Sequence, residues 1–141
     1  MPTRVAHATW EGKLRDGKGS FRGESGAIQA PYSFGTRFGD VAGTNPEELL
    51  AAAEAACFSM ALGAGLEQKG TPATKIDTSA ACTVEKQGDG FTITTMKLTV
   101  KATVPGIAND AFQEIVTATK QGCPVSRALA GVQISVDASL V

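Results

Sequence analysis

The chain has 141 residues, 43% of them hydrophobic, which is the size and composition of one globular domain with a core of its own. Thirteen basic and fourteen acidic residues give a formal net charge of −1, so nucleic acid and anionic membrane surfaces are not expected as partners. Residues 1–7 lack the apolar stretch of a signal peptide. We therefore expect a cytoplasmic protein whose three cysteines are reduced at rest.

The first third of the chain is rich in glycine and turn-forming residues, and this predicts a small antiparallel meander. Strands are expected over residues 6–14, over residues 20–23 and near Gln29, with a hairpin turn at residues 17–19. Aromatic residues alternate along residues 31–39, so this segment is expected to be irregular or a short strand.

A long helix follows, and its start is well marked. Asn45 is a good N-cap, Pro46 fits the first helical position, and Glu48 stands where it can complete a capping box. The helix is expected to run to about Lys69 and to end at Gly70.

The apolar window at residues 49–66 is long enough to be considered as a membrane span. It contains Glu54 and consists mostly of alanine, so we interpret it instead as a central helix of a soluble protein. Alanine on nearly every side predicts close packing all round this helix. No membrane partner is expected.

The rest of the chain alternates between strand and helix patterns. The expected elements are strands over residues 76–85 and 91–104 joined by a turn at residues 87–90, a helix from Asn109 or Asp110 to about Lys120 with Phe112, Ile115, Val116 and Thr119 on one face, a short helix from Pro124 to about Leu129, and a strand over residues 132–141. This order predicts an α+β fold in a single domain, residues 1–141.

The cysteines are the first candidates for chemistry. Cys57 lies too deep in its helix for the helix dipole to act on it, so it is either a small buried hydrophobe or a thiol activated by a cation from elsewhere. A buried carboxylate on Glu54, one turn earlier, would raise the pKa of that thiol. Cys123 precedes Pro124 at a predicted helix start, where free N–H groups favour a thiolate, although an incidental loop cysteine explains it as well. Cys82 is in phase with the buried side of a strand and is expected to fill the core.

Few other residues can take part in such a site. Arg37 follows an aromatic stretch and is the best candidate cation, with Arg127 as a second, although a solvated arginine is the plainer interpretation. Glu47 lies about 15 Å along the axis from Cys57 and cannot touch it on its own helix. His7 is the only histidine and is expected to be solvated near a frayed terminus, so no histidine-based nucleophile pair or metal site is predicted.

Seven short segments occur in a specific order over nearly the whole chain. They are Trp10-Glu11-Gly12, Glu24-Ser25-Gly26, Thr36-Arg37-Phe38, Gly43-Thr44-Asn45-Pro46-Glu47-Glu48-Leu49, Ala55-Ala56-Cys57-Phe58-Ser59-Met60-Ala61-Leu62, Val104-Pro105-Gly106-Ile107 and Gly122-Cys123-Pro124-Val125-Ser126. Together they resemble the osmotically inducible protein C (OsmC) / organic hydroperoxide resistance (Ohr) family of thiol peroxidases, and they look most like its OsmC branch.

The resemblance implies an OsmC-like fold, in which curved antiparallel sheets and a long central helix from each chain form an intertwined homodimer with two active sites at the subunit interface. Matched by position, Cys57 is the family's peroxide-reacting cysteine and Cys123 its resolving cysteine. Arg37 matches the arginine that activates the thiolate, and Glu47 matches the carboxylate that positions this arginine. The interface removes the distance objection, because Arg37 and Glu47 can come from the other chain.

The resemblance also implies the activity. The expected function is a cysteine-based, peroxiredoxin-like peroxidase that reduces organic hydroperoxides, and hydrogen peroxide as well, through a Cys57 sulfenic acid and a Cys57–Cys123 disulfide. No cofactor or metal is expected, and an external dithiol, for example of the lipoyl type, would restore the thiols. Two alternatives stay open: a dimer of the same fold that binds a hydrophobic ligand, and a redox sensor in which the same disulfide changes the shape without turnover.

Overall fold

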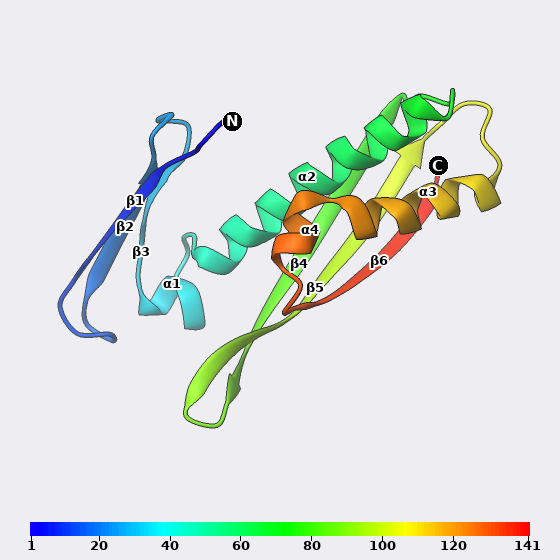
Figure 1. Cartoon of the computed structure of the whole chain (residues 1–141). Helices are drawn as coiled ribbons and strands as arrows, with labels where there is room; N and C mark the ends of the chain where they lie inside the picture. Colours follow the sequence, from blue (N-terminus) through cyan, green and yellow to red (C-terminus); the bar gives the residue numbers. More distant parts are fainter. The chain divides into compact units, whose positions relative to one another are not determined.

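The computed structural model describes all 141 residues, and they form two compact units, residues 1–49 and residues 50–141 (Figure 1). Each unit has a three-stranded sheet of its own, and helices accompany both sheets. This confirms the predicted α+β class. That the whole chain acts as one domain stays a prediction.

The predicted meander is present in residues 1–49. Strands β1 (Ala6–Glu11), β2 (Lys18–Gly23) and β3 (Gln29–Tyr32) pair antiparallel in that order. The first turn lies earlier than expected, because Gly19 already belongs to β2 and pairs with Trp10. A Cβ atom on Gly19 would come within 2.7 Å of the Trp10 ring and 2.6 Å of the Tyr32 ring, so glycine is needed there to let the two aromatic side chains lie over the strand.

The segment after β3 is a helix, and the expectation of a strand or irregular segment up to residue 39 is wrong for this part. Helix α1 (Phe34–Phe38) begins after Ser33, whose side chain accepts a hydrogen bond from the Thr36 backbone N–H while the Thr36 hydroxyl accepts one from the Ser33 N–H. Phe34 and Phe38 are four residues apart, and their ring centroids lie 5.2 Å from each other. Aromatic residues at this spacing fit one side of a helix as well as one side of a strand.

Helix α2 (Pro46–Gln68) begins and ends close to the predicted residues. The Asn45 side chain accepts the backbone N–H of Glu48 at 2.9 Å, which is one half of the predicted capping box. At the other end, Gly70 has a φ of 78°, which favours glycine. The N–H groups of Gly70 and Thr71 return to the carbonyls of Glu67 and Leu66, so the last turn has its hydrogen bonds satisfied.

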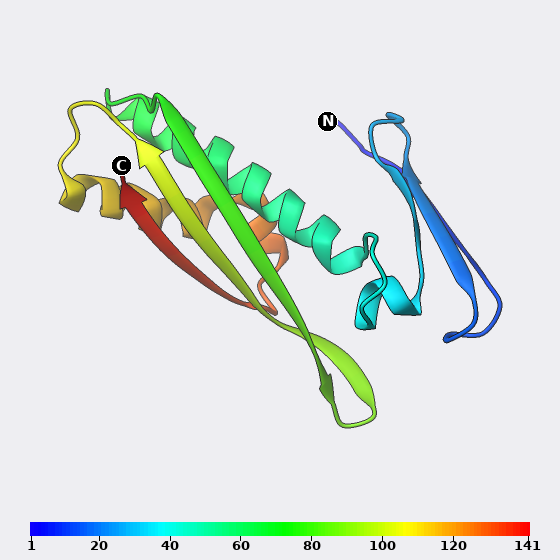
Figure 2. The same cartoon turned by 180° about the vertical axis from the view of Figure 1, so that it is seen from behind.

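Residues 50–141 build the second sheet and its helical layer. The elements are β4 (Lys75–Gln87), β5 (Gly90–Thr103), α3 (Asn109–Gly122), α4 (Pro124–Ala128) and β6 (Gln133–Leu140). β4 and β5 are antiparallel, whereas β6 runs parallel to β5 because α3 and α4 carry the chain back across the sheet. Figures 1 and 2 show α2 and α3 on the same face of this sheet, and its other face is free of helices.

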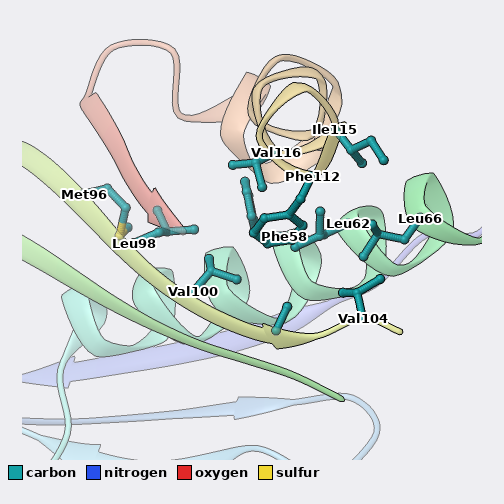
Figure 3. Packing of buried hydrophobic residues seen from close by; sticks show 11 residues of the cluster. Phe58, Leu62, Leu66, Met96, Leu98, Val100, Val104, Phe112, Ile115 and Val116 are labelled. Carbon is teal, nitrogen blue, oxygen red and sulfur yellow. The ribbon is translucent and has the colours of Figure 1, made fainter. Parts of the chain in front are cut away.

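The core lies between this sheet and the helices. Phe58, Leu62 and Leu66 of α2 are fully buried and point toward Phe112 and Val116 of α3 (Figure 3). The face predicted for α3 from its periodicity is confirmed, because its four members are the buried residues of that helix. Its start differs from the prediction, since Ala108 is the N-cap residue and no side chain caps the helix.

Only one side of α2 is buried within the chain, so the expected close packing all round it is wrong for a single copy. The opposite side is exposed and consists mainly of small residues, with Met60 at 79% exposure among them. These residues are Ala52, Ala53, Ala56, Met60 and Ala64. α2 is long and apolar enough to cross a membrane, as the core helices of some soluble proteins also are. Within this chain, 22% of its apolar window is buried.

The core is confined to the second unit. Every buried hydrophobic residue lies between Phe58 and Cys123, whereas Glu47 is the only buried residue in residues 1–49. A three-stranded sheet with one short helix and no buried apolar side chain gains little from the hydrophobic effect. The first unit therefore lacks the packing that normally stabilises a sheet of this size.

Because Leu62 is in the core and Leu14 is not, replacing each with alanine is expected to lower the free energy of unfolding by different amounts. Leu62→Ala removes a fully buried side chain and is expected to lower the free energy of unfolding by about 2–5 kcal/mol. Leu14→Ala, at a side chain that is 59% exposed, is the matched control and is expected to cost about 0.5 kcal/mol or less. Chemical denaturation at one protein concentration measures both, and equal losses would contradict this placement of the core.

Candidate active site

The fold brings the thiols of Cys57 and Cys123 together. Their sulfur atoms lie 3.1 Å apart, and both cysteines are free. Cys57 is half-buried on α2, whereas Cys123 is completely buried between the end of α3 and the start of α4. The Cys123 backbone N–H donates to the carbonyl of Thr119, and Pro124 opens the next helix, so local structure on both sides holds this cysteine in place.

The two thiols have different electrostatic surroundings. Burial raises the pKa of the Cys57 thiol, and the neighbouring Cys123 sulfur and the Glu54 carboxylate raise it further, against a backbone N–H of Val125 that lowers it. Burial also disfavours a charged Cys123. However, the Ser126 backbone and hydroxyl, the Cys57 thiol and the Val125 backbone together hold the pKa of Cys123 below its ordinary value. In this unit a negative charge is therefore easier to place on Cys123 than on Cys57.

A buried carboxylate lies close to the thiols. Glu54 precedes Cys57 by three residues on α2 and is completely buried. One of its oxygens, Oε1, accepts a hydrogen bond from the hydroxyl of Ser126 on α4, while Oε2 is buried without a hydrogen-bond partner. Glu54 forms none of the three ion pairs of the chain. The predicted effect of Glu54 on Cys57 is confirmed in direction, because its charge raises the pKa of that thiol.

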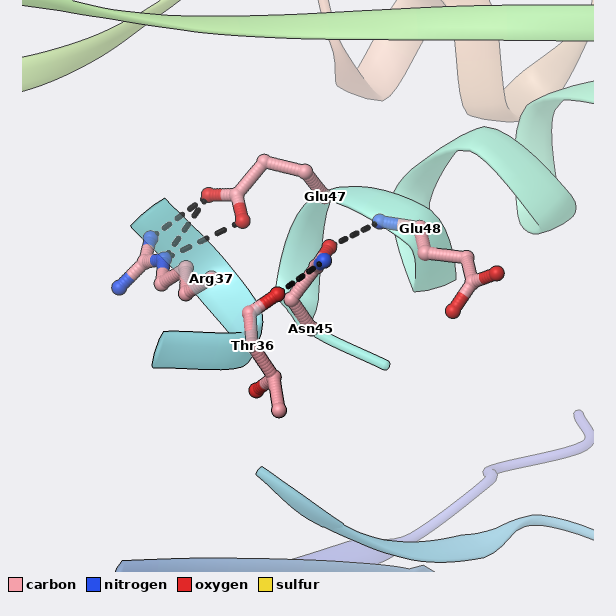
Figure 4. A network of polar contacts seen from close by, with 5 residues as sticks. All are labelled: Thr36, Arg37, Asn45, Glu47 and Glu48. Carbon is pink, nitrogen blue, oxygen red and sulfur yellow. Dashed lines mark hydrogen bonds and ion pairs between the residues drawn. The ribbon is translucent and has the colours of Figure 1, made fainter. Parts of the chain in front are cut away.

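Arg37 and Glu47 form the other predicted pair, within residues 1–49. The arginine Nε lies 3.1 and 3.2 Å from the two carboxylate oxygens of Glu47, and Nη2 lies 2.7 Å from Oε1 (Figure 4). The third nitrogen of the guanidinium points away from Glu47 in this view. Glu47 is buried, whereas the Arg37 side chain keeps 35% of its surface exposed. The carboxylate thus fixes the guanidinium through two N–H groups and leaves N–H groups available for another acceptor.

Asn45 ties the two helices that carry this pair. Its Oδ1 caps α2 through the Glu48 N–H, and its Nδ2 donates to the carbonyl of Thr36 in α1 at 2.9 Å. Figure 4 shows both bonds beside the Arg37–Glu47 contact. The Asn45-Pro46-Glu47 sequence therefore has two tasks, starting α2 and holding α1 with its arginine against the first turn of α2.

An aromatic pocket of about 230 Å³ opens next to Arg37 in the same unit. Its lining consists of Trp10, Leu14, Tyr32, Ser33, Phe34, Arg37 and Phe38. The guanidinium also lies over the Phe38 ring, with its carbon 4.9 Å from the ring centroid. The pocket thus combines apolar walls with one fixed cation.

The remaining candidates are placed as follows. Cys82 is half-buried and packs against the core, as predicted. His7 is exposed as predicted but belongs to strand β1, opposite Arg22, and is not frayed. Arg127 is exposed at the end of α4. No group of three or more histidine, cysteine and acidic side chains is arranged to hold a metal ion.

Sequence reasoning missed Ser126 and gave Glu54 no task beyond its charge. One signal was visible: Glu54 is the single acidic residue inside an apolar helical run, where an unpaired charge is costly. Its partner could not be foreseen, because Ser126 follows 72 positions later and belongs to a different helix.

The chain is similar to known proteins over most of its length. The sequence model of the family described as OsmC-like protein matches residues 38–137. The chain is 47% identical over 127 residues to the peroxiredoxin OsmC of Escherichia coli (strain K12), with 89% of each chain covered. It is 33% identical over 132 residues to the organic hydroperoxide resistance protein of Xanthomonas axonopodis pv. citri (strain 306), with 90% of this chain and 87% of the relative covered. The crystal structure of the organic hydroperoxide resistance protein OhrB of Bacillus subtilis matches with a TM-score of 0.76 at 25% identity, covering 96% of this chain and 98% of that one.

The electrostatics of the thiol pair predict the effect of removing the buried charge. Glu54→Gln is expected to lower the pKa of Cys57, because the negative charge that opposes its ionisation is lost. The rate at which an alkylating reagent modifies Cys57 is followed by mass spectrometry as a function of pH. The pH at which this rate reaches half its maximum should be lower in the variant. Glu67→Gln, at an exposed position of the same helix, is the control and should not move it. An upward shift in Glu54→Gln would contradict this account.

Proposed function

Because this chain belongs to the OsmC-like protein family, we propose that it is a thiol-dependent peroxidase that reduces organic hydroperoxides to alcohols. The observation that carries this proposal is the 3.1 Å separation of the free Cys57 and Cys123 sulfurs. The relatives named peroxiredoxin OsmC and organic hydroperoxide resistance protein support a role in hydroperoxide detoxification. The higher identity to the former, 47% against 33%, fits the OsmC branch.

In the first step the Cys57 thiolate attacks one oxygen of the peroxide bond. The O–O bond breaks, the alcohol leaves after taking up a proton, and Cys57 becomes a sulfenic acid. Cys57 suits this step better than Cys123, because part of its surface is exposed while Cys123 has none. Hydrogen peroxide reacts in the same way and gives water.

In the second step the Cys123 sulfur attacks the Cys57 sulfenic acid and water leaves. The two sulfurs need to approach by about 1 Å to reach the disulfide bond length. The pKa of Cys123, held below its ordinary value, favours the thiolate form that makes this attack. An external dithiol then reduces the disulfide by exchange, in keeping with a reducing cytoplasm as the site of action.

The raised pKa of Cys57 means that residues 50–141 do not activate this thiol by themselves. A cation has to come from elsewhere, and Arg37 is suited to this task, because Glu47 fixes it while leaving N–H groups unused. We assign Arg37 to stabilising the Cys57 thiolate and Glu47 to positioning Arg37.

A homodimer would bring Arg37 of one copy to Cys57 of the other. It would also cover two surfaces that have no partner within one chain. The first unit has no buried apolar side chain, and α2 exposes a side made of Ala52, Ala53, Ala56, Met60 and Ala64. Small side chains allow close approach of a second helix. In the proposed dimer these sides of two copies pack together, the first unit of one copy is covered by the other, and Arg37 and Glu47 complete the thiol site across the interface.

The pocket beside Arg37 indicates the substrate class. Trp10, Tyr32, Phe34 and Phe38 give it apolar walls, and its volume of about 230 Å³ suits a small organic group. Burial of an alkyl or aryl group there contributes binding free energy that hydrogen peroxide cannot supply. We therefore expect a higher kcat/KM for organic hydroperoxides than for hydrogen peroxide.

The central test is turnover of an organic hydroperoxide in the presence of a dithiol reductant. Cys57→Ser is expected to lower turnover by roughly 10³-fold or more, because it removes the nucleophile. Cys123→Ser should still consume one equivalent of hydroperoxide and accumulate the sulfenic acid, which a dimedone adduct reveals. Cys82→Ser is the matched control and should keep its activity. Full turnover by Cys57→Ser would refute the proposed function, and oxidation of the wild type without turnover would favour a sensor.

The dimer has its own test. Met60→Lys places a charge on the exposed side of α2, and it is expected to weaken the dimer by about 100-fold or more and to lower peroxidase activity with it. Thr83→Lys, at an exposed position of β4 on the helix-free face of the sheet, is the control. Sedimentation and activity are measured on the same samples. A monomeric Met60→Lys variant with full activity would show that Arg37 need not come from a second copy.

A further inference from the structure

Glu54 and Ser126 are the buried polar pair for which the proposed peroxidase chemistry has no task so far. Both are buried, Glu54 completely, and the Ser126 hydroxyl donates to Oε1 of Glu54. The other carboxylate oxygen, Oε2, is buried without a partner, and no lysine or arginine pairs with Glu54. A carboxylate in such a place is costly, and alanine, which fills most neighbouring positions of α2, would avoid the cost. Its presence next to two free thiols 3.1 Å apart is therefore a sign of function.

Ser126 stands between the carboxylate and the resolving sulfur. Its hydroxyl bonds to Glu54, and the same hydroxyl acts on Cys123, where it favours the thiolate. A serine hydroxyl has one proton to donate and can accept others, so it can receive a proton on one side while it gives its own on the other. Glu54, Ser126 and Cys123 are thus three buried groups in sequence: a hydrogen bond joins the first two, and Ser126 lies in the first turn of the helix that Cys123 precedes.

We infer that Glu54 and Ser126 form a proton relay that removes the proton from Cys123 when this cysteine attacks oxidised Cys57. The inference rests on the proposed peroxidase function for its biological setting, while the relay itself acts on any disulfide-forming step at these two sulfurs. Ser126 lies in the first turn of α4, three residues after Cys123, and Glu54 acts through Ser126.

The protons and electrons of the step balance as follows. The Cys123 S–H proton passes to the Ser126 hydroxyl, and the hydroxyl's own proton passes to Oε1 of Glu54. The Cys123 electron pair forms the bond to the Cys57 sulfur, and the S–O bond of the sulfenic acid breaks with its pair. The departing hydroxide takes up the proton that Glu54 now holds, and it leaves as water. Cys57 and Cys123 end as a disulfide, and Glu54 is again a carboxylate.

The relay matters most once Cys57 has been oxidised. In the reduced protein the Cys57 thiol is one of the groups that favour a Cys123 thiolate. A sulfenic acid has lost that S–H, so the Cys57 sulfur itself no longer donates to Cys123 at the moment when Cys123 has to attack. The Ser126 hydroxyl is then the remaining side chain that acts on Cys123, and Glu54 decides where its proton goes.

Intramolecular thiol exchange tests the relay without any peroxide. In a Cys82→Ser background, an aromatic disulfide reagent converts Cys57 to a mixed disulfide with thionitrobenzoate. Attack by Cys123 on the Cys57 sulfur then releases the coloured thionitrobenzoate thiolate. This leaving group needs no proton, so the release rate reports deprotonation and attack by Cys123 alone. Labelling of Cys57 is timed in the same experiment as a separate check that the site is intact.

Glu54→Gln and Ser126→Ala are each expected to lower the release rate itself by about 10-fold or more. Labelling of Cys57 should not slow in Glu54→Gln, because loss of the carboxylate charge lowers the pKa of that thiol. The double variant should lose no more than either single variant, because a relay fails as a unit. Ser126→Thr keeps the hydroxyl and should retain the rate. The matched controls are Glu67→Gln and Ser135→Ala, at exposed positions of α2 and β6.

Release rates within about two-fold of the wild type in both single variants would overturn the relay, and so would additive losses in the double variant. Equal slowing of labelling and release would mean a structural role and would also overturn it. Wild-type consumption of cumene hydroperoxide is measured in parallel. A wild type that does not consume it, but whose release rate depends on Glu54 and Ser126, would refute the peroxidase proposal and leave the relay supported.

Discussion

The packing of α2 on the second sheet is the constraint on which the thiol site depends. Phe58, Leu62 and Leu66 fix the rotation of the helix, because they occupy one side of it and are fully buried. With that rotation fixed, Glu54 lies inside the protein and Cys57 lies at the boundary between buried and exposed surface. The sulfur-to-sulfur distance of 3.1 Å is then set by where α3 ends and α4 begins. The closeness of the two thiols therefore results from ordinary core packing, so a change in the core on α2 is expected to alter the thiol site as well as the stability.

The chain divides its chemistry between two kinds of environment. Residues 50–141 hold the sulfurs, a buried carboxylate and backbone N–H groups, and in these surroundings Cys123 ionises more easily than Cys57. Residues 1–49 hold an arginine fixed by a buried glutamate beside an aromatic pocket. In the proposed dimer these sets meet, so that Cys57 becomes a strong nucleophile only in the assembled protein. Such an arrangement would keep an unassembled chain from exposing a reactive thiolate.

The two buried carboxylates have opposite tasks in this proposal. Glu47 has a cation as its partner, so its charge is compensated and serves to orient Arg37. Glu54 has only a hydroxyl as its hydrogen-bond partner and no cation beside it, and in the proposed relay it accepts a proton. One residue type thus serves positioning in one place and proton transfer in another, and the difference lies in the neighbour that each carboxylate meets.

Local features of the sequence determined much of the secondary structure. Asn45, Pro46 and Gly70 bound α2, and the spacing of Phe112, Ile115, Val116 and Thr119 identified the buried face of α3, because caps and periodicity act over a few residues. The same local reasoning failed at Phe34 and Phe38, whose spacing fits a helix as well as a strand. Motifs quoted along the chain were enough to predict the family and to single out Cys57, Cys123, Arg37 and Glu47. Only the tertiary structure decided that the two sulfurs meet, that Glu54 bonds to Ser126 and that Cys123 carries the lower pKa. These properties depend on groups 66 to 72 positions apart and on the burial they share, and no local pattern in a sequence specifies that.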